Sequence, residues 1–341
     1  MRASIPRFFK RLWPWGLALA LSLSLIYLDY RQFLETPLSV ADSGLTIELK
    51  PGAGIRQLVQ QLQRQPGLSR PAFYLEGYAR LNGQSSRLKA GEYAVTPGLT
   101  PPELLDRIVA GRVIQYPLTI VEGWTFRQLR QALATHPKLA QTLPGLNDAE
   151  IMTRLGRPGL HPEGWFLPDT YHFPKGFTDE AFLRRALTAM EQRLAAVWER
   201  RVPDVPLTDP YQALILASII EKETGVAAER AEIAGVFARR LRLRMRLQTD
   251  PTVIYGLGEG FDGNLRRQDL EADTPYNTYT RQGLPPTPIA LPGAAALAAA
   301  VNPASGDALY FVADGQGGHV FSRTLEEHHQ AVRRYQQRKG D

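Results

Sequence analysis

The feature that most restricts what this chain can fold into is an uncharged, largely apolar run near its start, Leu12–Leu28. A helix over this run is about 26 Å long, just enough to cross the hydrocarbon core of a bilayer. The residues before it are basic, and the first acidic residue is Asp29. Because positive charge stays on the cytoplasmic side, we expect a cytoplasmic tail over residues 1–11 and a single-pass transmembrane anchor over residues 12–30.

A cleaved signal peptide is the alternative interpretation of this segment. Signal peptidase needs small residues after the apolar run, but Tyr27, Asp29 and Tyr30 stand there. Trp13 and Trp15 mark the other end of the run, as in the aromatic belts of membrane helices. The pattern favours a retained anchor, with the N-terminus cytoplasmic and the bulk of the chain on the other side of the membrane.

Charge and composition argue against several kinds of function. Four of the 40 Lys and Arg residues precede the apolar run, which leaves 36 against 34 Asp and Glu, so we expect no nucleic-acid partner. The absence of Cys excludes disulfides, thiolate metal sites and a cysteine nucleophile. The six His residues are scattered without a His-Glu-x-x-His pattern, so we expect no metal and no cofactor.

After the anchor, the pattern predicts an α+β chain with two folded parts. Residues 31–43 are expected to form a tether, because Pro37 interrupts a continuous helix. Residues 44–113 are expected to form a small α/β module, and residues 114–341 a larger, mixed α+β domain. The module's predicted strands cover residues 45–49 and 91–95, and its predicted helices cover 55–62, 71–81 and 100–110.

The larger domain is predicted to be mainly helical. Its longest predicted helices cover residues 177–201, 209–224 and 227–243. Residues 248–292 are predicted as loops because Pro, Thr and Asn are frequent there. Asp314–Gly318 lies between two short strand patterns and predicts a hairpin.

The helix predicted over residues 209–224 carries the strongest candidate for acid–base chemistry. Helical spacing places Glu221 on the side of Ala217 and Ser218, among small and apolar neighbours. Burial disfavours an ionised carboxylate, so a glutamate there can hold a proton and act as a general acid. Glu223 lies about 200° further round the helix and is predicted to face elsewhere. A solvated glutamate at a helix end is the structural alternative.

Other chemistry in the same region has weaker support. Ser218 and Lys222 are four residues apart and can face each other as a nucleophilic dyad, although the Ser-x-x-Lys pattern is missed by one residue. The basic run Arg239–Arg246 is either a solvated helix end or a contact for a polyanion.

Two loops contain the amide, hydroxyl and aromatic side chains that suit a sugar. We expect residues 248–250 and 276–279 to line one groove with Glu221, with Asn277 as the first choice for a sugar contact; a purely structural role in covering the core is the alternative. Asp250 either caps the turn before Pro251 or orients a neighbour. The candidate substrate-binding residues are Ser218, Glu223, Gln248, Thr249, Asp250, Tyr276, Asn277, Thr278 and Tyr279.

Six segments of the chain together resemble the YceG-like (MltG) family of endolytic murein transglycosylases. They are LTIVEGWT at 118–125, EGWFLPDTY at 163–171, ASIIEKET at 217–224, LQTDPTVIYG at 247–256, YNTYTRQGLPPTPI at 276–289 and YFVADGQGGHVFS at 310–322. The resemblance covers nearly the whole chain. It implies that residues 44–113 are a LysM-like module and residues 114–341 the YceG-like catalytic domain.

The resemblance also implies an activity, that of a lyase that cuts peptidoglycan glycan strands between N-acetylmuramic acid (MurNAc) and N-acetylglucosamine (GlcNAc) and leaves 1,6-anhydro-MurNAc ends. It assigns the catalytic acid to the first Glu of the E-K-E-T motif, Glu221. That group would protonate the β-1,4 oxygen and then take the proton of the muramyl C6 hydroxyl. Peptidoglycan synthases (penicillin-binding proteins) are the implied partners, with the enzyme limiting strand length. The resemblance further implies that the anchor lies in the cell inner membrane and that the catalytic domain is periplasmic.

Two alternatives to the lytic activity remain. A muramidase hydrolase needs a second carboxylate, for which Asp250 and Glu223 are the candidates. A wall-binding scaffold needs no catalysis at all, although the intact ASIIEKET segment argues against it.

Overall fold

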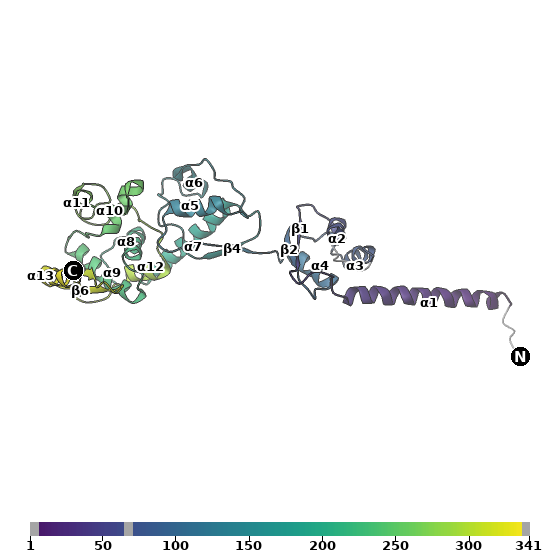
Figure 1. Cartoon of the computed structure of the whole chain (residues 1–341). Coiled ribbons are helices and arrows are strands. Elements are labelled where there is room, and N and C mark those ends of the chain that lie inside the picture. The colour runs from purple at the N-terminus through teal and green to yellow at the C-terminus, as the bar shows by residue number, and fades with distance from the viewer. Residues whose placement is uncertain (1–6, 65–70, 336–341) are drawn as a thin grey trace. The chain divides into compact units, whose positions relative to one another are not determined.

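The computed structural model describes residues 7–64 and 71–335 of the 341-residue chain. The chain divides into two compact units, one made of Met1–Tyr116 with Phe173–Lys175 and the other of Pro117–His172 with Gly176–Asp341. Figure 1 shows the helices and strands of both units.

The first helix, α1 (Arg7–Glu35), contains the predicted anchor. Within the part of the chain that the structure describes, it is the one helix long and apolar enough to cross a membrane, over Trp15–Glu35. The hydroxyls of Ser22 and Ser24 donate to carbonyls one turn earlier, so neither is left unpaired. Arg2, one of the basic residues before the apolar run on which the orientation prediction depends, lies outside the described residues.

The prediction of a tether directly after the anchor is wrong. Helix α1 continues to Glu35, and Phe33 (3% exposed) and Leu38 are buried in the core of the small module. The Tyr74 ring lies 5.5 Å from the Phe33 ring, and the Tyr74 hydroxyl donates to Asp29 at 2.8 Å. The helix does end just before Pro37. The apolar side chains on either side of Pro37 are nevertheless buried in the module, because removing apolar surface from water is favourable.

The small module has the predicted element order. Strands β1 (Leu45–Leu49) and β2 (Gly91–Val95) pair antiparallel, and helices α2 (Ile55–Arg64), α3 (Phe73–Leu81) and α4 (Pro101–Ala110) complete it. Leu58, Leu75 and Leu104, one from each helix, are fully buried in a common core. A capping box at Thr100 begins α4, with the Thr100 N–H donating to Glu103 at 2.8 Å.

The larger unit is a helical assembly with short strand pairs. Its first elements are β3 (Tyr116–Thr119), α5 (Phe126–Thr135), α6 (Asp148–Arg154), β4 (Thr170–Phe173), which pairs with β3, and α7 (Asp179–Glu199). Then follow α8 (Pro210–Glu223), η1 (Ala227–Glu229), α9 (Arg230–Arg242), α10 (Asp250–Leu257), η2 (Gly258–Gly260) and α11 (Arg267–Glu271). The last elements are α12 (Ala294–Val301), the antiparallel hairpin β5 (Tyr310–Ala313) and β6 (His319–Ser322), and α13 (Leu325–Tyr335).

Helix α8 is the central element of this unit. All eight residues of Ala213–Ile220 are buried, so the helix is covered on every side. Helices α7, α9, α10 and α12 pack against it, and the small side chains of α12 let that helix approach closely. The two glutamates of the E-K-E-T motif follow this buried stretch at the C-terminal end of α8, where Lys222 is the exposed residue.

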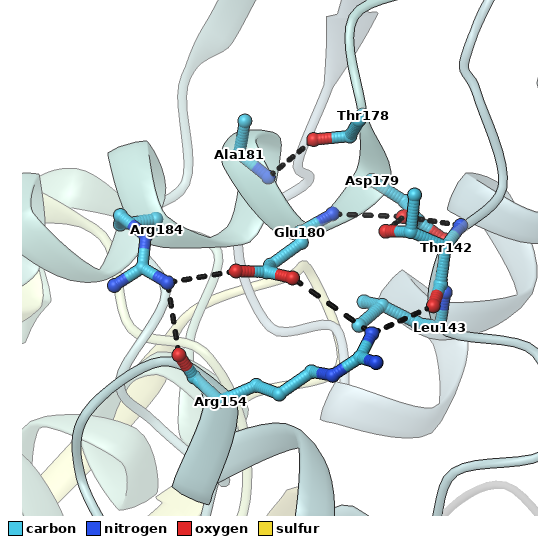
Figure 2. Close-up of polar contacts among 8 residues, drawn as sticks. All are labelled: Thr142, Leu143, Arg154, Thr178, Asp179, Glu180, Ala181 and Arg184. Carbon is cyan, nitrogen blue, oxygen red and sulfur yellow. Dashed lines mark hydrogen bonds and ion pairs between the residues drawn. The ribbon is translucent and has the colours of Figure 1, made fainter.

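A buried carboxylate fixes the start of α7 (Figure 2). Asp179 accepts hydrogen bonds from the main-chain N–H groups of Thr142 at 2.9 Å and Leu143 at 3.2 Å. Next to it, Glu180 accepts from Arg184 at 2.8 Å. A negative charge at a helix N-terminus is favourable, and here it ties the preceding loop to the helix.

Candidate active site

A cavity of about 540 Å³ lies beside the C-terminal end of α8. Its walls come from the end of α8, the start of α10, the β5–β6 hairpin and α13. The cavity lining includes the polar residues Glu223, Gln248, Thr249, Asp250, Tyr279 and His319. This size is typical of ligand pockets.

Glu223 is the last residue of α8 and lines this cavity. Its carboxylate accepts a hydrogen bond from the hydroxyl of Thr249. Burial raises the pKa of Glu223 above its ordinary value, and the Thr249 hydrogen bond offsets only part of that effect. A carboxyl group that keeps its proton in a cavity has the character of a general acid.

Glu221 is not among the residues that line the cavity. Its side chain is 5% exposed, and it accepts from the Gly293 N–H at 2.8 Å and from the Arg230 guanidinium at 3.3 Å. These contacts tie α8 to the starts of α12 and α9. We expected Glu221 to share a groove with residues 248–250 and 276–279, but Glu223, not Glu221, lines the cavity with residues 248–250 and Tyr279. The predicted 200° between the two glutamates puts Glu223, not Glu221, on the cavity side.

We expect Glu221→Gln to act mainly on stability. The amide removes a buried charge that Arg230 pairs with, and the free energy of unfolding should fall by roughly 1–3 kcal/mol. Cleavage, measured well below the unfolding temperature, should stay within a few-fold of the wild type. Glu122→Gln is the matched control, because Glu122 lies 3.9 Å from the same Arg230 but is half-exposed. Loss of cleavage at unchanged stability would make Glu221 catalytic.

The loop before α10 supplies polar groups to the cavity wall. The Thr249 N–H donates to the Thr278 hydroxyl at 3.1 Å, and the Gln248 N–H donates to the Thr278 carbonyl at 3.1 Å. Gln248 has a φ of 50°, in the left-handed region, so the chain turns sharply at the cavity rim. Asp250 accepts from the Tyr279 hydroxyl at 2.6 Å and therefore orients a neighbour. The N-cap of α10 is Thr249.

The second loop contributes only Tyr279 to the cavity. Asn277, the first choice for a sugar contact, is 0% exposed. Its amide N–H groups donate to the carbonyls of Asp269, Leu270 and Ala272 at 3.1, 3.0 and 2.6 Å, and its oxygen accepts from the Tyr279 N–H at 2.8 Å. The structure leaves it no surface for a sugar, so that prediction is wrong.

The neighbours of Asn277 also have internal contacts. The Thr278 hydroxyl is buried and lies 2.9 Å from the Thr252 hydroxyl. The Tyr276 hydroxyl lies 2.8 Å from the Thr287 hydroxyl. Neither residue lines the cavity, so both support the wall from behind.

The Ser218–Lys222 dyad is not formed. Ser218 is fully buried, donates to the Ile215 carbonyl at 2.7 Å and accepts from the Ile289 N–H at 3.0 Å. Lys222 extends toward the Gly123 carbonyl at 3.4 Å. Ser218 therefore holds the chain segment before α12 against α8, and it is not available to a substrate.

The basic run at the end of α9 is partly internal. Arg240 is buried and donates to the carbonyls of Leu309 at 2.6 Å and Leu247 at 2.7 Å. It joins the β5–β6 hairpin to the loop before α10, which are two walls of the cavity. Among the described residues, no group of three or more His, Asp or Glu side chains could hold a metal ion.

The sequence interpretation did not single out the pair His319 and Glu229. The two Glu229 oxygens lie 2.8 Å from the His319 main-chain nitrogen and 2.8 Å from its Nδ1. His319 lines the cavity together with Glu223. The residues are 90 positions apart, so no local pattern predicts the contact.

Glu163, a second carboxyl group whose pKa is raised by burial, gives a pH-dependent prediction. Burial raises the pKa of Glu163 to about 7. A raised pKa in the folded state stabilises the protein below the ordinary pKa, and this contribution is lost as the pH rises through about 7. Glu163→Gln should remove that decline and raise the unfolding temperature at pH 8 relative to the wild type. Parallel pH profiles of the two proteins would contradict it.

Comparisons with known proteins identify the family of the chain. The YceG-like family model matches residues 47–334, so the chain belongs to the YceG-like family. It is 30% identical to a Bacillus subtilis protein named endolytic murein transglycosylase, over 91% of this chain and 89% of that one. A Streptococcus pneumoniae protein of the same name is 27% identical, over 89% of this chain and 61% of its own length. A crystal structure of a yceG-like protein from Listeria monocytogenes is also similar, with a TM-score of 0.55 and 30% identity over 85% of this chain and 99% of that one.

Proposed function

We propose that this protein is a membrane-anchored endolytic transglycosylase that cuts the MurNAc–GlcNAc β-1,4 bond of peptidoglycan and leaves 1,6-anhydro-MurNAc ends. Membership of a family whose relatives carry the name endolytic murein transglycosylase supports the enzyme class, a peptidoglycan lyase. The observation that carries the mechanism is the buried Glu223, with its raised pKa, in the wall of the cavity.

In this proposal Glu223 takes the role that the sequence interpretation gave to Glu221. Its proton passes to the oxygen between MurNAc and GlcNAc, and the bond from that oxygen to the muramyl C1 breaks. The C6 hydroxyl of the same muramyl residue closes on C1 and gives up its proton. No water enters the product, so one proton donor and one proton acceptor suffice, where a hydrolase also has to position a water molecule.

The hydrolase alternative needs a second carboxylate in the cavity, and Asp250 lines the cavity together with Glu223. Its hydrogen bond from Tyr279 supports an orienting role. The test is to incubate the periplasmic part with glycan strands and weigh the products. Anhydro ends support the proposal, reducing ends that have gained water indicate a hydrolase, and intact strands indicate a wall-binding scaffold.

The anchor and the small module fit the same role. We expect residues from about Tyr30 onward to face the periplasm, because basic residues precede the apolar run. Protease added to spheroplasts should digest the bulk of the chain, and full protection would reverse the orientation.

The module over residues 44–113 is proposed as a LysM-like part that binds glycan next to the membrane. The packing of Phe33 and Leu38 into its core supports a position close to the end of the anchor. Penicillin-binding synthases, which make new strands at that surface, are the proposed partners.

A further inference from the structure

His319 is a histidine in the cavity that the proposed mechanism has not yet used. It is the first residue of β6, its side chain is 13% exposed, and it lines the cavity with Glu223. The two residues come from different walls, one from the hairpin and one from the end of α8. A sugar held in the cavity can therefore meet an acid on one wall and an imidazole on the other.

Glu229 fixes which nitrogen of His319 is available. Burial alone would raise the pKa of Glu229, but hydrogen bonds from the His319 side chain and main chain outweigh it and hold the pKa below its ordinary value. An ionised Glu229 accepts a proton-bearing Nδ1, which leaves the lone pair on Nε2. Among the residues that the structure describes, Nε2 has no hydrogen-bond partner.

The turn before His319 positions the imidazole of His319 next to the carboxylate of Glu229. Asp314 accepts from the N–H groups of Gln316 at 2.7 Å and Gly318 at 3.0 Å, which closes the hairpin. A Cβ atom at Gly318 would lie 2.9 Å from the Glu229 oxygen, so a residue without a side chain is needed there. The hairpin thus holds the imidazole at a fixed place in the wall.

We propose that His319 is the base that removes the proton of the muramyl C6 hydroxyl; this inference rests on the proposed function. As Glu223 protonates the glycosidic oxygen, the C1–O4 bond breaks and its electron pair stays on the departing GlcNAc oxygen. The C6 oxygen forms the new C1–O6 bond, and its proton moves to Nε2. The imidazolium then returns a proton through solvent to the Glu223 carboxylate, which restores both groups.

The other groups around His319 are less suited to this step. Asp250 is already bonded by Tyr279, and Arg240 is held by main-chain carbonyls. His328 and His329 line the cavity from α13, and no carboxylate contact of either ring is among the described hydrogen bonds. The charged groups that bear on His319 itself are Glu229, Asp314 and Glu223.

The test compares the full-length protein with His319→Asn on defined glycan strands. Asparagine can still donate to Glu229 but has nothing in place of Nε2. We expect cleavage to slow by roughly 10²-fold and the remaining products to shift from anhydro ends toward reducing ends, because water replaces the activated C6 hydroxyl. A merely structural role would not change that ratio. His172→Asn, on an exposed strand position outside the cavity, is the control for the substitution and should match the wild type.

Near-normal cleavage with only anhydro ends in His319→Asn would overturn the inference. If thermal unfolding shows that His319→Asn is not folded, Glu229→Gln provides the test instead. This variant keeps the imidazole and removes the carboxylate charge that orients it. We expect that variant to lose roughly tenfold in turnover with KM little changed, and unchanged turnover would overturn the inference. Wild-type protein that produces no anhydro ends would instead refute the proposed function.

Discussion

Glu223→Gln is expected to lower the rate of glycan cleavage by roughly 10²–10⁴-fold, which is the usual contribution of general acid catalysis. The amide has the size of the carboxyl group and can still accept from Thr249, but it has no proton to give. Because burial raises the pKa of Glu223, its ionisation destabilises the fold as the pH rises, so the amide should not lower the unfolding temperature at pH 8.

Comparing Glu223→Gln with Glu221→Gln shows which of the two glutamates is the catalytic acid. The two residues are on the same helix, two positions apart, and both side chains are largely buried. Initial rates and thermal unfolding should separate them, with Glu223→Gln losing rate and Glu221→Gln losing stability. The reverse pattern would return the catalytic role to Glu221 and contradict the assignment of the cavity.

Asn277→Ala is expected to lower the free energy of unfolding by about 2–4 kcal/mol. The change leaves the carbonyls of Asp269, Leu270 and Ala272 without the donor they share, and it leaves the Tyr279 N–H without its acceptor. Denaturant midpoints measure the loss. Asn277→Asp is the matched control, because it keeps the acceptor but puts an oxygen where the three carbonyls need a donor.

A residue that contacted the sugar would behave differently. Its replacement would reduce cleavage while leaving the denaturant midpoint unchanged. If Asn277→Ala gave that result, the structural role of this side chain would be wrong.

Local signals in the sequence predict the helix starts well. The capping boxes at Thr100, Thr125 and Asn147 are all formed, because each one depends on residues three positions apart. Helices α10 and α11 escape prediction, since Pro, Asp and Thr make their surroundings look like loops, although Pro251 stands in the first turn of α10, where proline is favourable.

The candidate site was harder to predict, because its members come together only through packing. Helical periodicity predicts that Glu221 and Glu223 diverge, but the cavity side depends on the loop before α10 and on the hairpin that pack near Glu223. Residue type suggests a sugar contact for Asn277, but burial makes it a support for the loop. The pairing of His319 with Glu229 joins segments that are distant in the sequence.

The most direct test of the central claim is to digest glycan strands with the wild-type protein in water labelled with heavy oxygen and to weigh the new ends. The account predicts anhydro-MurNAc ends that carry no label, because the C6 hydroxyl of the sugar displaces the bond that Glu223 protonates. One labelled oxygen gained at each cut would mean that water attacks C1, and lytic cleavage in this cavity would then be ruled out.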